Sequence, residues 1–294
     1  MGKQAWGAQR SARDQWVSAV ERVLARTSMG VAIVVGFYVA VELWGGFDDH
    51  LHGSLADWYG YMNATHYFLR TGEFYWPFQL TGHPYDVIRM GGQLYPPVIL
   101  YLLIPFTVLP SFLWWVIPIG ITAGAIVALR PARWTWPLLT LAFIAPRTGT
   151  LIWFGNPGMW VVAAMSLGAL FRWPAVLVLL KPSLAPFALL GIRRRGWWIL
   201  LGLGVLASLP LLRLWVQYPS VIANSGVDPL YSLSEAVPMC LPLIALAGRD
   251  GRTFAQLLGE LQQRAAAVTG RLPRAPRDHA PEAVVSGGAE SRPA

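Results

Sequence analysis

Acidic and histidine side chains gather in one stretch of this 294-residue chain, between residues 47 and 95. The stretch holds Asp48, Asp49, His50, His52, Asp57, His66, Glu73, His83 and Asp86. Because the rest of the chain is largely apolar, general acid or base chemistry is expected here. The alternative is a solvated loop that is polar for that reason alone. The residues at 48–52 lack a recognisable metal-ligand spacing, so we predict no metal ion or other cofactor.

Part of this stretch has the pattern of a helix. Residues 56–70 (ADWYGYMNATHYFLR) contain no proline and carry aromatic residues at helical spacing. Asp57 and Tyr61 are four residues apart, so they would share one face. Because aromatic rings favour the boundary between lipid and water, we predict a helix that lies along a membrane surface.

Three cations stand beside or within apolar segments, where they could bind an anionic ligand. Arg89 shortly precedes one such segment, Arg213 lies near the end of another, and Lys181 lies in the middle of a third. An ionised side chain inside a membrane is costly enough to indicate a function. Arg213 could instead extend its long side chain to the lipid headgroups, and Lys181 could pair with a backbone carbonyl.

The apolar composition of the chain predicts which kind of structure positions these residues. Hydrophobic residues make up 55% of the chain and charged residues 13%, a balance that is unsuited to a soluble domain of this size. We predict an all-α integral membrane bundle of about eight transmembrane segments, the shorter of which could be re-entrant. The segments are 29–46, 96–110, 112–129, 134–147, 157–171, 173–192, 197–216 and 235–248.

Basic residues predict the orientation of these segments. With the N-terminus inside, sixteen of the 23 basic residues lie inside, among them Arg147, and five lie outside. Because positive charge favours the cytoplasmic side, both termini are predicted to be cytoplasmic and the loop 47–95 to lie outside. The net charge of +8 is therefore a topology signal, and no nucleic-acid partner is predicted.

Three regions follow from this topology. Residues 1–28 form a cytoplasmic segment, residues 29–248 a membrane domain, and residues 249–294 a cytoplasmic tail. In the tail, apolar residues recur at helical spacing from Phe254 to Val268, which predicts a short amphipathic helix on the inner leaflet or in solvent. The proline-, glycine- and serine-rich end that follows is expected to be disordered.

Several short motifs follow one another along the chain. They are DWYGY at 57–61, LRTGEFY at 69–75, PY at 84–85, YPP at 95–97 with Pro105, FGNP at 154–157, and LKPS at 180–183 ahead of RRR at 193–195. In this order and spacing, over about residues 30 to 225, the chain resembles GT-C type membrane glycosyltransferases. It is most similar to the polyprenol-phosphate-mannose-dependent α-mannosyltransferases. The resemblance implies a GT-C-like helical bundle with a long first outer loop.

The resemblance also implies roles for individual residues. Asp57 matches the acidic residue that serves as the general base, with Asp48 and Asp49 as alternatives. The donor's phosphate leaves as an anion and needs a cation at that depth. The cations that would bind it are Arg89, Arg213 and Lys181. Further side chains expected to contact the substrates are Tyr61, His66, Tyr95 and Asn156.

The expected activity is transfer of mannose, or another hexose or pentose, from a polyprenyl phosphate to a glycolipid or cell-wall glycan acceptor at the outer face of the cell membrane. Family members continue through several more spans after the loop that here covers 217–234. The resemblance therefore implies a C-terminally short chain, or a protein partner that supplies those spans. The alternative function is non-catalytic: a carrier of a lipid-linked sugar, or an inactive subunit of a glycan-assembly complex.

Overall fold

The structure, a computed structural model, describes residues 2–48, 55–82, 92–225, 234–251 and 254–268. Within these ranges all regular secondary structure is helical, which confirms the all-α class. The helix predicted at 56–70 is confirmed as well, because α2 spans Ala56–Thr71. Asp49, Arg89 and the end of the chain predicted to be disordered lie outside the described residues. Asp48 is the last residue of α1, but its side chain also lies outside the description.

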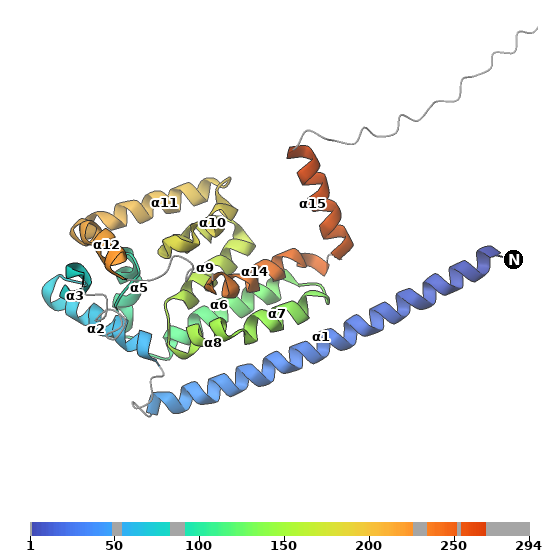
Figure 1. Cartoon of the computed structure of the whole chain (residues 1–294), viewed down its shortest axis with the longest axis horizontal. Coiled ribbons are helices and arrows are strands. Elements are labelled where there is room, and N and C mark those ends of the chain that lie inside the picture. Colours follow the sequence, from blue (N-terminus) through green and yellow to red (C-terminus); the bar gives the residue numbers. More distant parts are fainter. Residues whose placement is uncertain (1, 49–54, 83–91, 226–233, 252–253, 269–294) are drawn as a thin grey trace, which may run out of the picture. The chain divides into compact units, whose positions relative to one another are not determined.

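Helices follow one another along the described parts of the chain (Figure 1). The α-helices are α1 (Gly2–Asp48), α2 (Ala56–Thr71), α3 (Pro77–Thr81), α5 (Leu100–Leu103), α6 (Leu113–Leu129), α7 (Thr135–Ile144), α8 (Pro146–Trp153), α9 (Gly158–Phe171), α10 (Ala185–Ala188), α11 (Arg195–Ser208), α12 (Leu212–Asn224), α14 (Ala236–Ala247) and α15 (Phe254–Val268). The 3-10 helices are η1 (Pro97–Ile99), η2 (Ile104–Thr107), η3 (Trp173–Leu180), η4 (Pro182–Leu184), η5 (Leu189–Gly191), η6 (Leu209–Leu211) and η7 (Arg249–Gly251). Each apolar segment predicted from the sequence overlaps one of these helical stretches.

Among the residues that the structure describes, two helices are long and apolar enough to cross a membrane. They are Trp16–Val39, which lies within α1, and Arg195–Asn224, which runs through α11, η6 and α12. The pair of α8 and α9, bent by 115°, would add a third span if counted as one. The remaining apolar helices are shorter than the roughly 20 residues that a straight crossing requires. The membrane-compatible helical class is thus supported, whereas eight spans remain a prediction.

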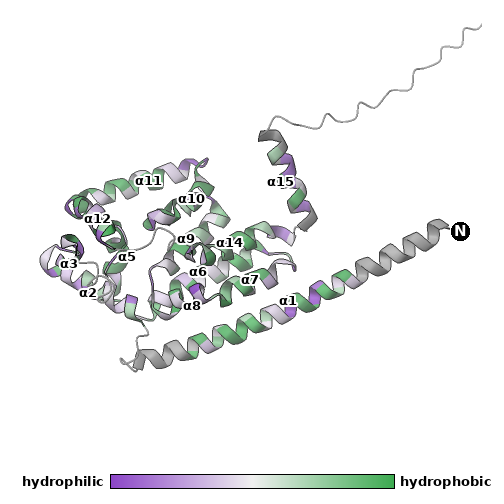
Figure 2. Ribbon diagram, in the orientation of Figure 1, coloured by the Kyte–Doolittle hydropathy of each residue, from purple (hydrophilic) through white to green (hydrophobic). Residues whose placement is uncertain are grey.

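Large apolar side chains cover the outer faces of several helices. Val127 of α6 is 71% exposed and Leu206 of α11 is 61% exposed. Figure 2 shows hydrophobic residues along much of α6, α7 and α11. Exposed apolar faces of this extent are unfavourable in water, and hydrocarbon is the solvent that suits them.

The chain up to Phe254 forms one compact unit, and the residues from Ala255 onward belong to a second. In the first unit α1 packs against α7, where Thr140 donates a hydrogen bond to the carbonyl of Ser28 at 2.9 Å. In the second, α15 confirms the short helix predicted for the tail. Leu261 of α15 is about half exposed.

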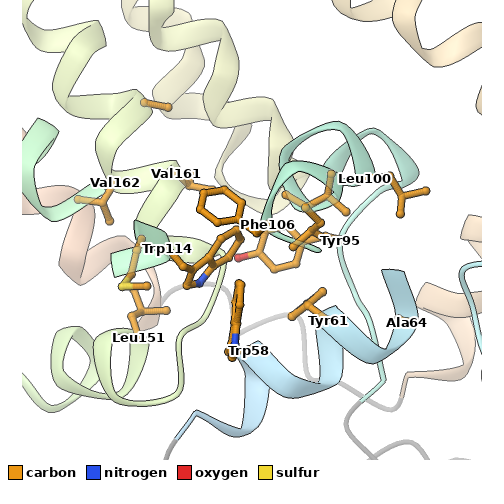
Figure 3. Packing of buried hydrophobic residues seen from close by; sticks show 14 of the residues in the cluster. Trp58, Tyr61, Ala64, Tyr95, Leu100, Phe106, Trp114, Leu151, Val161 and Val162 are labelled. Atoms are coloured by element: carbon orange, nitrogen blue, oxygen red, sulfur yellow. The ribbon is translucent and has the colours of Figure 1, made fainter. Parts of the chain in front are cut away.

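An aromatic cluster forms the core around the first turn of α2. Trp58 lies with its ring centroid 5.1 Å from that of Trp114, and Phe106 and Trp160 contact Trp114 from other sides. Figure 3 shows Trp58 projecting from α2 toward Trp114 and Phe106. Because Trp114 is fully buried, this cluster holds α2 against α6 and α9.

Candidate functional site

A tight turn between α8 and α9 positions Asn156 in the site. At Gly155 the backbone has φ +67°, a conformation that residues with a Cβ rarely adopt. A Cβ at Gly155 would also lie 2.6 Å from the Trp115 ring and 2.9 Å from the Trp58 Cβ. Glycine is therefore needed here for both its φ angle and its lack of volume. The turn sets the direction in which the next residue, Asn156, leaves the backbone.

Replacing Gly155 with alanine is therefore expected to lower the free energy of unfolding by about 2–4 kcal/mol, from backbone strain and overpacking together. Thermal unfolding of the purified protein in detergent measures the loss. Gly120→Ala is the matched control, because Gly120 lies inside α6 and a Cβ there meets no atom within 4 Å. Equal stability of the two variants would contradict this account of the turn.

The first turn of α2 docks directly on this loop. The backbone N–H groups of Leu55 and Trp58 donate to the carbonyls of Trp153 and Phe154, each at 3.0 Å. The N–H groups at the start of a helix have no partner within it, so these carbonyls supply one. Asp57 lies between the two anchored residues. It is thereby brought beside Asn156, from which it is almost a hundred residues away in sequence.

Two tryptophans of α6 hold the same loop from the other side. Trp114 Nε1 donates to the carbonyl of Gly155, and Trp115 Nε1 donates to that of Ile152, both at 2.8 Å. These bonds add side-chain donors to carbonyls at and just beyond the end of α8. The loop is thus fixed by α2 and α6 together.

Asn156 connects the loop to Asp57 and Tyr95. Its Nδ2 donates to Asp57 Oδ2 at 2.6 Å. Its Oδ1 accepts from the Tyr95 hydroxyl at 3.0 Å and from the backbone N–H of Gly158 at 2.8 Å. Because both ends of the amide are engaged, Asn156 holds the Asp57 carboxylate in one orientation.

Cations and a buried carboxylate extend this chain of contacts. Lys181 Nζ lies 3.5 Å from the Tyr95 hydroxyl oxygen and 4.9 Å from the centre of the Tyr95 ring. Lys181 is also ion-paired with Glu235. The other Glu235 oxygen, Oε1, accepts from Arg147 at 2.5 Å. We refer to the residues connected in this way as the polar cluster: Asp57, Asn156, Tyr95, Lys181, Glu235 and Arg147.

Five of the six members of the polar cluster lie at the end of a helix or in the break between two helices. Asp57 and Arg147 are in the first turns of α2 and α8, and Glu235 directly precedes α14. Asn156 lies in the break between α8 and α9, and Lys181 in the break between η3 and η4. Broken helices are tolerated in membrane proteins where the backbone lines an internal site. The breaks therefore mark the same place as the polar side chains.

The electrostatics of the cluster favour a carboxyl group that can accept a proton. Burial raises the pKa of Asp57 above its ordinary value of 3.8, and the nearby Glu235 raises it further. The hydrogen bond from Asn156 and the charges of Arg147 and Lys181 lower it. Desolvation is the largest of these effects, so Asp57 is a stronger base than an exposed aspartate.

Tyr61 places an uncharged aromatic ring beside the site. It lies one turn after Asp57 on α2, with its ring edge-on to Tyr95 at 5.6 Å. Burial, followed by the charge of Asp57, raises the pKa of Tyr61 well above its ordinary value. Tyr61 therefore stays protonated and would contact a ligand without acting as a base.

The remaining residues predicted from the sequence lie elsewhere or pair differently. Arg213 forms an ion pair with Glu73, whose other oxygen accepts from Gln217 at 3.2 Å. The Arg213 side chain is 72% exposed. His66 lies on α2 with an exposed side chain. Of the three cations expected to bind phosphate, Lys181 is the one that the structure joins to Asp57 through described contacts.

Arg147 and Glu235 are members that the sequence did not single out. Arg147 is counted among the inner basic residues, and Glu235 merely opens an apolar segment. The eight residues of α8 extend about 12 Å, far less than the thickness of a bilayer. Arg147 and Asp57 therefore lie closer together than the inner placement of Arg147 and the outer placement of the loop 47–95 imply.

Comparisons with protein-family models, with curated proteins and with solved structures found no match for this chain. Its function is therefore inferred from the residues of the site and their chemistry. The polar cluster combines two carboxylates, those of Asp57 and Glu235, with two cations, those of Arg147 and Lys181. Such a set can accept a proton from one ligand and hold an anionic group of another.

Proposed function

We propose that this chain is a membrane glycosyltransferase. It transfers a sugar, such as mannose or another hexose or pentose, from a polyprenyl-phosphate donor to a hydroxyl group of a glycolipid or cell-wall glycan. Asp57 is the general base, at the outer face of a GT-C-like bundle of about eight segments, some of them re-entrant. No metal ion or other cofactor takes part.

The main support is the convergence of the motif residues. Asp57, Tyr95, Asn156 and Lys181 each stand in a different motif of the resemblance, and one continuous chain of contacts joins all four. If the loop were polar only because it is solvated, these four residues would not be expected to lie together. If they form one active site, they would.

The transfer needs one group that takes a proton and one group that leaves with an electron pair. The acceptor hydroxyl oxygen forms a bond to the anomeric carbon of the donor sugar, while the bond from that carbon to the phosphate oxygen breaks. The hydroxyl proton passes to the Asp57 carboxylate, and the phosphate leaves with the bonding electron pair. Asn156 keeps the accepting oxygen in place, so that the base is oriented before the acceptor arrives.

Substitution of Asn156 by alanine tests this orientation. The variant loses a hydrogen bond to a charged group, so transfer at neutral pH is expected to fall by about 10- to 100-fold. That bond also lowers the pKa of Asp57, so its loss raises the pKa further. Asp57 is active as a base only above its pKa, and the acid limb of the pH–rate profile should therefore move to higher pH.

Asn224→Ala is the matched control for this measurement. The Asn224 amide donates to the backbone carbonyls of Gln79 and Leu80 and belongs to no part of the polar cluster as defined here. Its acid limb should stay where it is in the wild type. An acid limb that is unmoved, or moved to lower pH, in Asn156→Ala would contradict the role given to this residue.

The proposed function itself is tested by a transfer assay. Membranes that contain the full chain are incubated with radiolabelled polyprenyl-phosphate mannose and host glycolipids, and label entering the glycolipid fraction is measured against membranes without the chain. Chain-dependent transfer supports the proposal. If vesicles containing the purified chain move the labelled lipid between leaflets without any transfer, the carrier function replaces it.

A further inference from the structure

Two cations from separate parts of the chain converge on one buried carboxylate. The Glu235 side chain is only 3% exposed, whereas those of Arg147 and Lys181 are 21% and 16% exposed. Each cation contacts a different oxygen of Glu235. Proteins also use arginine and lysine side chains in this way to hold the oxygens of a phosphate.

The charges of the polar cluster balance only while Glu235 stays in place. Asp57 and Glu235 offset Arg147 and Lys181, so an incoming anion meets no net positive charge. If a phosphate oxygen takes the position of the carboxylate, the two cations bind the ligand instead. Glu235 therefore competes with any anion for the same two partners.

An apolar cavity lies beside the helices that carry Arg147 and Glu235. It has a volume of about 450 Å³ and is lined by side chains of α1, α6, α7, α8, α9 and α14, among them Leu151 and Pro238. Leu151 follows Arg147 by one turn of α8, and Pro238 follows Glu235 by three residues, so each pair shares a helix face. A ligand with an anionic head at Arg147 would have an apolar space within reach of its tail.

We infer that Arg147 and Lys181 bind the phosphate of a lipid with a hydrocarbon chain, and that Glu235 occupies this site until the ligand displaces it. The lipid chain enters the cavity beside α8 and α14. This assigns the donor phosphate of the proposed glycosyltransferase to Arg147 and Lys181. It rests on the proposed function for the sugar on the lipid, and on the described contacts for phosphate binding.

Binding of radiolabelled farnesyl phosphate to the purified full chain in detergent tests the inference. Competition by unlabelled farnesyl phosphate should be much stronger than competition by farnesol or by inorganic phosphate, because the site recognises head and chain together. Effective competition by inorganic phosphate alone would show that the hydrocarbon chain is not recognised. Effective competition by farnesol would show that the phosphate is not recognised. Either result would contradict the inference.

Variants distinguish two roles for Glu235: a carboxylate that competes with the ligand, or a structural partner of the two cations. Glu235→Gln should tighten farnesyl phosphate binding by about tenfold, and Arg147→Gln or Lys181→Gln should weaken it by about tenfold, the effect of one charge-assisted contact. The matched controls are Asp250→Asn and Arg249→Gln, which change an exposed ion pair. Both should bind as the wild type does.

The effect of Glu235→Gln can also be measured in a variant that has lost one of the two cations, so that two positive charges are not left without the Glu235 carboxylate. In the Lys181→Gln background, adding Glu235→Gln removes the competing charge from Arg147 and should restore binding. If Glu235→Gln does not improve binding in either background, Glu235 is a structural partner of the cations and the inference fails. Binding with the expected pattern, in a chain that transfers no sugar, would retain the inference and reject the glycosyltransferase.

Discussion

Replacing Asp57 with asparagine is expected to lower sugar transfer by about 10²- to 10⁴-fold, the usual contribution of a general base. The substitution keeps the shape of the side chain. Asn156 Nδ2 can still donate to the remaining side-chain oxygen, as it does to Asp57 Oδ2 in the wild type. What is lost is the ability to take the acceptor's proton. Label entering the glycolipid fraction measures the effect.

Stability separates this chemical role from a structural one. Because burial raises the pKa of Asp57, the folded protein disfavours the charged carboxylate. Asparagine carries no charge, so the variant should unfold at the same temperature as the wild type or slightly above it. Asp250→Asn, which changes an exposed carboxylate, should keep full transfer. Wild-type transfer by Asp57→Asn would end the assignment of Asp57 as the base.

The largest effect on stability is expected from Trp114→Ala, at about 3–5 kcal/mol of unfolding free energy. Trp114 is fully buried and contacts the rings of Trp58, Phe106 and Trp160. Its removal leaves a cavity among these rings and also deprives the Gly155 carbonyl of its hydrogen bond. Thermal unfolding in detergent, with protease sensitivity as a second readout, measures the loss.

A comparison with Trp114→Phe divides this effect into its parts. Phenylalanine keeps most of the apolar ring but cannot donate to Gly155, so it should lose less stability than alanine. Val127→Ala serves as the control, because Val127 is 71% exposed on α6. If Trp114→Ala were no less stable than Val127→Ala, the aromatic cluster would not be what holds α2 in place.

Local sequence patterns are enough to predict most of the helices. Composition and apolar run length predict an all-α membrane-compatible chain, because these properties reflect the solvent around each residue. Helical spacing between residues 56 and 70 predicts α2, because contacts within a helix are between near neighbours in sequence. The number of complete spans is less well determined. Helices such as α7 and α14 are apolar yet short, and nothing local shows whether they cross or turn back.

The motifs also single out Asp57, Tyr95, Asn156 and Lys181 from the sequence, but as separate residues. Their connection depends on the left-handed turn at Gly155 and on the docking of α2 against Trp153 and Phe154. Both are long-range features. No periodicity within either segment encodes which distant carbonyl a helix terminus will meet.

The sequence by itself thus determined the helical class, the apolar segments and the residue types available for chemistry. Only the tertiary structure decided which charges pair. It joined Glu235 to Arg147 and Lys181, and it linked these charges to Asp57 through Tyr95 and Asn156. The physical reason is that a buried ion pair is fixed by where helices break and pack, whereas sequence patterns report a residue's own solvent and near neighbours.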